Sequence, residues 1–129
     1  MILGLVGTFL VVRGFLLFSP ETDLHIGEHN VHHLFVGLIL ILAFQPLLAR
    51  AEGNLWRLRL SALGYGAGLS LALDEWAYLI ATDGSNASYW LPVSYWGGLL
   101  MISVATFYLI GMDLAAALQA RAETSGVPE

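Results

Sequence analysis

The sequence predicts an all-α fold, a four-helix transmembrane bundle with both termini cytoplasmic. The chain of 129 residues is 57% hydrophobic and 12% charged, which is too little charge to cover the surface of a soluble domain. Four apolar segments each come close to the roughly 20 helical residues that cross a hydrocarbon core of about 30 Å. We therefore expect an integral membrane protein of a bacterial or archaeal cell membrane. Its single domain would cover residues 1–118, with a cytoplasmic tail over 119–129.

The first two spans are expected at about residues 2–18 and 29–49. The first has no basic residue at its start and carries Arg13 inside its apolar run, so we interpret it as a retained span and not as a signal peptide. Near the end of the second span stand Gln45 and Pro46, which predict a kink.

The third and fourth spans are expected at about residues 60–82 and 94–117. Both carry small residues at helical spacing, which allow neighbouring helices to approach closely. These residues are Gly64, Gly66, Gly68, Ser70, Gly97 and Gly98. Ordinary bundle packing is the expected role, with a glycine-rich ligand groove as the alternative.

The arginines predict the orientation. Arg50, Arg57 and Arg59 lie between or beside the second and third spans, and Arg121 lies in the tail. The other two connections have no basic residue, so the positive-inside rule places them outside. Aromatic residues are expected to form a belt at that outer interface. They are Tyr89, Trp90, Tyr95 and Trp96.

The composition also excludes several chemistries. The chain has no cysteine and no lysine, which excludes thiolate metal sites, disulfides and a lysine Schiff base. Its five basic residues are dispersed and its net charge is −5, so a nucleic-acid partner is not expected.

All four histidines lie with a glutamate in one short segment at the start of the second span. These residues are His25, Glu28, His29, His32 and His33. Ionisable groups inside a span are costly, and they usually serve a function. If the helix begins before residue 25, a rotation of about 100° per residue brings all five side chains within roughly 140° of one another. A break at Gly27 is the alternative.

The third span supplies a complement in Asp74 and Glu75. The first and third spans rise toward the outside, and the second descends from it. Arg13, these carboxylates and the histidines therefore lie at a similar depth, in the outer half of the bilayer. We therefore expect Arg13 to be a counter-ion of Asp74 or Glu75. Tyr78, one turn beyond Asp74, is expected either to donate a hydrogen bond to a site residue or simply to pack.

Imidazoles with carboxylates suit a divalent metal ion such as zinc, iron or manganese. The preferred ligands are His29, His33 and Glu75, with Asp74 or His32 as a fourth ligand or a hydrogen-bonding partner. Further candidate ligands are Glu28 and His25. The alternatives are a metal-free proton or substrate relay, a bis-histidine haem, and purely structural polar packing.

The first functional hypothesis is a metal-dependent enzyme that acts on a lipid or another membrane-embedded small molecule. Glu75 and Asp74 would be its catalytic residues, beside a water activated by the metal. The alternatives are a metal-ion or proton transporter and a non-catalytic subunit of a larger membrane complex. The bilayer is the expected partner, and a homo-oligomer remains open.

Two motifs carry a resemblance to known proteins: residues 32–37, His-His-Leu-Phe-Val-Gly, and residues 71–76, Leu-Ala-Leu-Asp-Glu-Trp. The chain resembles a loose group of uncharacterised bacterial four-span membrane proteins, which pair a His-His-aromatic motif with a Leu-Asp-Glu-aromatic motif on the next span. The resemblance covers about residues 28–80, and Leu34 departs from it by separating the histidines from Phe35. It implies no activity, but it implies that the two motifs form one unit.

Overall fold

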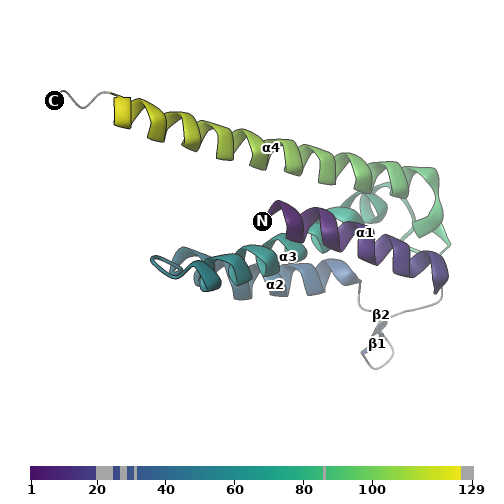
Figure 1. Cartoon of the computed structure of the whole chain (residues 1–129). Coiled ribbons are helices and arrows are strands. Elements are labelled where there is room, and N and C mark those ends of the chain that lie inside the picture. The colour runs from purple at the N-terminus through teal and green to yellow at the C-terminus, as the bar shows by residue number, and fades with distance from the viewer. Residues whose placement is uncertain (20–24, 27–28, 31, 86, 126–129) are drawn as a thin grey trace.

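The computed structural model of the protein describes residues 1–19, 25–26, 29–30, 32–85 and 87–125. Within these residues it contains four α-helices, which confirms the helical bundle (Figure 1). They are α1 (Ile2–Phe18), α2 (His33–Ala49), α3 (Leu55–Ala81) and α4 (Pro92–Ser125). Two-residue strands β1 (His25–Ile26) and β2 (His29–Asn30) pair antiparallel, and a 3-10 helix η1 (Ser88–Trp90) precedes α4.

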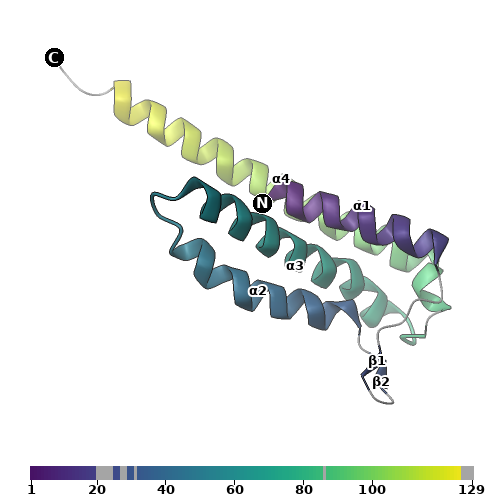
Figure 2. The same ribbon diagram turned by 60° about the horizontal axis from the view of Figure 1, so that its bottom comes forward.

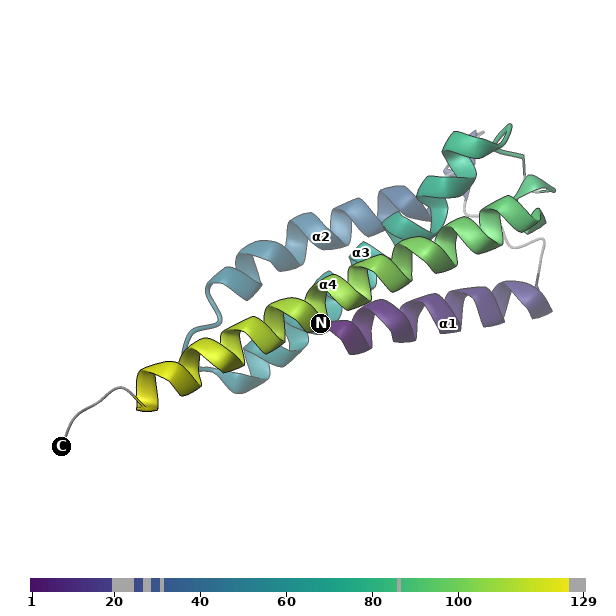
Figure 3. The ribbon, with the colours of Figure 1, turned by 90° about the horizontal axis from the view of Figure 1, so that it is seen from above.

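Helix α3 is the centre of the bundle. It packs against α1, α2 and α4, and α1 also contacts α4. Figure 2 shows α3 between α2 on one side and the α1–α4 pair on the other. Helix α4 has 34 residues, a length of about 51 Å. Its far end projects beyond the connection between α2 and α3, as a view from above also shows (Figure 3).

The exposed surface of the bundle is apolar, and its interior is unusually polar. Large side chains that point outward include Leu3, Val11 and Phe18, exposed by 74%, 70% and 90%. The buried apolar cluster is small, built on Leu5, Phe9 and Ile102. Within the described residues, only α4, over Pro92–Thr124, is long and apolar enough to cross a membrane, while α1 and α2 are shorter apolar helices.

Each expected span corresponds to one helix, although the bounds differ for three of the four. Helix α1 has the expected bounds, and α4 is longer than expected at both ends. Helix α3 begins at Leu55, because the Asn54 side chain caps it by accepting from the Arg57 N–H at 3.0 Å. Helix α2 begins only at His33, so the predicted continuous helix through residues 25–33 is wrong. Gly27 and Asn30 both have low helix propensity, which favours the break that was the alternative.

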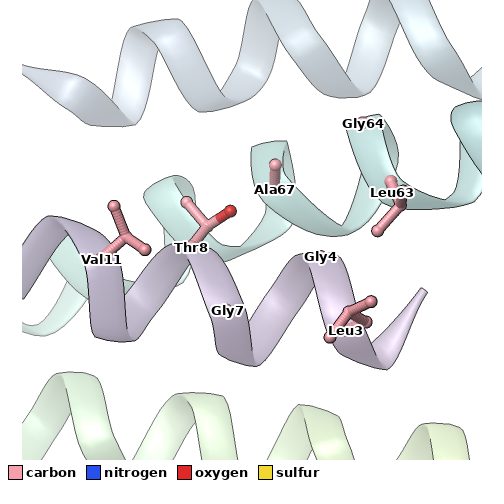
Figure 4. Close-up of a pocket in the computed structure, with 8 residues that line it drawn as sticks. All are labelled: Leu3, Gly4, Gly7, Thr8, Val11, Leu63, Gly64 and Ala67. Carbon is pink, nitrogen blue, oxygen red and sulfur yellow. The ribbon is translucent and has the colours of Figure 1, made fainter.

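Glycines set the closest helix contacts, as predicted. Gly37 and Gly68 face each other between α2 and α3, where an added Cβ on Gly68 would lie 2.7 Å from the Gly37 carbonyl oxygen. Gly64 meets the ring of Phe44 in the same interface. By contrast, Gly7 on α1 has open space at its Cβ position. It lies in a shallow apolar groove between α1 and α3, lined mainly by small and aliphatic residues (Figure 4).

A matched pair of alanine substitutions tests this packing. We expect Gly68→Ala to lower the free energy of unfolding by about 1–3 kcal/mol, because the new methyl group forces α2 away from α3. Gly7→Ala should raise it by roughly 0.5–1 kcal/mol, since alanine loses less entropy in a helix and meets nothing. Denaturant unfolding in detergent micelles measures both. Equal effects of the two substitutions would contradict the assigned α2–α3 contact.

Candidate functional site: a buried histidine–carboxylate cluster

An ion pair between α1 and α3 is the centre of the site. Arg13 donates from Nε to Asp74 Oδ1 at 2.8 Å, and its Nη2 lies 2.7 Å from the same oxygen. Both residues are buried, with exposed fractions of 6% and 2%. Nη2 also donates to the backbone oxygen of Ser94 on α4 at 3.2 Å. The predicted pairing of Arg13 with a carboxylate of the third span is therefore confirmed, and Asp74 is the partner.

Helix α4 covers this pair with its backbone at Gly98. A Cβ on Gly98 would lie 2.5 Å from Asp74 Oδ1 and 3.1 Å from Arg13 Nη2. Only glycine leaves room for both groups, so this residue excludes solvent without disturbing the pair. The sequence marked Gly98 only as a packing residue.

Tyr89 of η1 closes the site from the connection between α3 and α4. Its hydroxyl donates to Asp74 Oδ2 at 2.7 Å, and the Arg13 guanidinium carbon lies 4.3 Å from its ring centroid. Burial raises the pKa of the Tyr89 hydroxyl far above its usual range, and the charge of Asp74 raises it further. The hydroxyl thus stays protonated and remains a donor.

The prediction that Tyr89 belongs to an interfacial aromatic belt is therefore wrong, because its side chain is only 8% exposed. Trp90, Tyr95 and Trp96, with exposed fractions of 38%, 46% and 62%, do lie at the surface.

Glu75 points the other way around α3 and meets the start of α2. Its Oε2 accepts from the Leu34 backbone N–H at 2.5 Å, and its Oε1 lies 2.7 Å from His32 Nδ1. The first turn of α2 has no acidic residue of its own, and its N-cap His32 makes no side-chain cap hydrogen bond. The carboxylate of Glu75 therefore acts as the anion that the positive end of this helix dipole favours.

His33 lies between the two carboxylates. Its Nδ1 is 3.5 Å from Glu75 Oε2, and its Nε2 is 3.4 Å from Asp74 Oδ2. Nε2 is buried and has no hydrogen-bond partner within the described residues. About a quarter of each imidazole side chain of His32 and His33 is exposed, against 3% for each carboxylate.

Searches against protein families, curated proteins and solved structures found no match for this chain. The resemblance carried by the His32–His33 and Asp74–Glu75 motifs therefore stays a prediction.

The remaining predicted site residues divide into two groups. Tyr78 is 2% exposed and lies beside the site, with its ring 6.0 Å from that of His32 and its hydroxyl donating to the Ser85 carbonyl oxygen at 3.1 Å. The side chains of His25 and His29, and all of Glu28, lie outside the described residues. His25 and His29 lie in β1 and β2, not in α2. The prediction that these two residues share one helical face with His33 is therefore wrong.

No group of three or more metal-ligating side chains that could hold an ion occurs among the described residues. Asp74 accepts from Arg13 and Tyr89, and Glu75 accepts from the Leu34 N–H beside His32. The predicted divalent metal, with His29, His33 and Glu75 as ligands, is not tested by this arrangement and stays a prediction.

A double-mutant cycle tests the central ion pair. We expect Arg13→Met or Asp74→Leu alone to lower the free energy of unfolding by about 3–5 kcal/mol, because each leaves a buried charge without its partner. The double variant should lose less than the sum of the two, with the coupling measured by denaturant unfolding in micelles. Strictly additive losses would mean that the two side chains are not paired.

Proposed function

We propose that the chain is a small four-span membrane protein whose histidine–carboxylate cluster binds and passes on a proton near the outer face. The observation that carries this proposal is His33, whose two ring nitrogens face the two buried carboxylates from opposite sides of the imidazole. An imidazole can accept a proton at one ring nitrogen and release it from the other.

The distribution of side chains supports the four spans. Arg13, Asp74, Glu75 and Ser70 are buried, while leucines, valines and phenylalanines of α1, α2 and α4 are exposed. A hydrocarbon solvent favours this arrangement, since lipid accepts apolar side chains and rejects charges. Helices α1 and α2 have 17 residues each, the lower end of the range of about 17–25 that spans a bilayer.

The orientation follows from the charges at the two ends of the bundle. Arg50 and Arg57 flank the connection between α2 and α3, at the opposite end of α3 from Glu75. With the arginines in the cytoplasm, the cluster faces the outside. Both termini then lie in the cytoplasm.

The charges of the cluster also favour a proton. Arg13 balances one of the two carboxylates, so neutral histidines leave one net negative charge in a buried site. A buried charge without a partner is costly. A proton shared by Glu75 and His32, whose contact is 2.7 Å, neutralises the cluster. His32 and His33 are each about a quarter exposed, so the proton exchanges with the outer solvent through these two imidazoles.

Proton flux into vesicles tests the proposal. We expect vesicles with the wild-type protein to dissipate an imposed pH gradient faster than empty vesicles, as reported by a pH-sensitive dye. Glu75→Gln and His33→Phe should reduce the flux to the level of empty vesicles, because each removes a proton-binding group. Glu52→Gln, at an exposed residue of the α2–α3 connection, is the control and should behave like wild type. Wild-type flux equal to that of empty vesicles would refute the proposal.

Metal analysis separates this proposal from the metal-dependent alternative. Elemental analysis of tag-free protein purified without chelators should find no divalent metal near one per chain, because the carboxylate oxygens already accept hydrogen bonds from protein groups. Stoichiometric zinc, iron or manganese that is lost in both His33→Phe and Glu75→Gln would favour the metal site instead.

A further inference from the structure

Ser70 of α3 has a buried hydroxyl that none of the contacts described above explains. The residue is 1% exposed, and its Oγ has no hydrogen-bond partner within the described residues. Buried polar atoms in native proteins nearly always have a partner, either a protein group or an ordered water. An ordered water is the kind of partner that this hydroxyl lacks among the described residues.

Other hydroxyls in these helices satisfy themselves locally. Thr82, Ser103 and Thr106 each donate to the backbone carbonyl four residues earlier, at 2.7, 2.8 and 2.7 Å. This is the usual contact of a serine or threonine inside a helix. Ser70 lies in the middle of α3 and is more deeply buried, yet it does not make this bond.

Ser70 stands one helical turn before Asp74, on the same face of α3. Side chains four residues apart on a helix have Cβ atoms about 5–6 Å apart, a spacing that one bridging water can fill. Two more buried atoms that lack a hydrogen-bond partner in the described part of the chain belong to residues in contact with Asp74: Arg13 Nη1 and His33 Nε2. The three atoms come from three helices; two of their residues contact Asp74, and the third stands one turn from it.

We propose that ordered water molecules bind around Asp74, held by Ser70 Oγ, His33 Nε2 and Arg13 Nη1. A buried water typically makes two to four hydrogen bonds to polar groups. These three atoms and the Asp74 carboxylate can supply those hydrogen bonds. On the proton function proposed above, on which this part rests, the waters extend the polar path of the cluster from Asp74 toward Ser70. Since α3 rises toward the outer face, Ser70 lies on the inner side of Asp74.

Water-edited solid-state NMR of the full chain in lipid bilayers tests the hydration directly. Magnetisation from water should reach Ser70 and Asp74 much faster than Leu5, an equally buried apolar residue. In Ser70→Ala the transfer to Asp74 should slow severalfold. Ser103→Ala is the matched control, because the Ser103 hydroxyl is satisfied by its own helix, and it should leave the transfer unchanged. Transfer to Ser70 as slow as to Leu5 would overturn the proposal.

The same variants in the vesicle assay separate the two proposals. Proton flux should fall severalfold in Ser70→Ala and stay at the wild-type level in Ser103→Ala. Rapid water transfer without any wild-type flux would leave the hydration site standing and refute the proton function. Flux that is unaffected by Ser70→Ala would overturn the role of this water path, whatever the NMR result.

Discussion

The buried ion pair between Arg13 and Asp74 is the contact on which the rest of the bundle depends. A charge in an apolar interior must have a partner, so the position of Arg13 on α1 fixes the height of that helix against α3. The guanidinium also bonds the Ser94 carbonyl oxygen, and Gly98 gives α4 the room to approach. With Tyr89 donating to the second oxygen of Asp74, one carboxylate positions α1, α4 and η1 together.

Glu75 positions the remaining helix, α2, in the same way. Adjacent residues on a helix point about 100° apart, so Asp74 faces α1 and α4 while Glu75 faces α2. There it accepts from the Leu34 N–H, and it holds the start of α2 although α2 has no acidic residue in its first turn. The Asp74–Glu75 pair therefore links all four helices through polar contacts, in a bundle with only a small apolar core. Each of the two adjacent buried carboxylates therefore has hydrogen-bonding partners in the interior of the bundle.

The sequence predicted the parts of this architecture that follow from hydrophobic runs and depth. Apolar segments located four helices, and the shared depth of Arg13 and Asp74 predicted their pairing. Contacts made by irregular segments were missed. Tyr89 stands beside surface aromatics and looks identical to them in sequence, because burial of a connection depends on how it folds back on the bundle. The start of α2 was missed for a related reason. Its capping group, Glu75, lies 41 residues away, and helical periodicity carries no signal for a cap supplied by another helix.

The surroundings of the two carboxylates assign them different roles. Asp74 is held by a permanently charged guanidinium and by a phenol that stays protonated, because burial raises the pKa of Tyr89. Both partners donate to Asp74, so protein donors occupy its two oxygens. Among the described residues, Glu75 has no arginine in contact, and its neighbours are the imidazoles of His32 and His33. On the proton function proposed above, the exchangeable proton is shared by Glu75 and the two histidines. Asp74, paired with Arg13, remains beside His33 as the charge that stabilises a protonated imidazole.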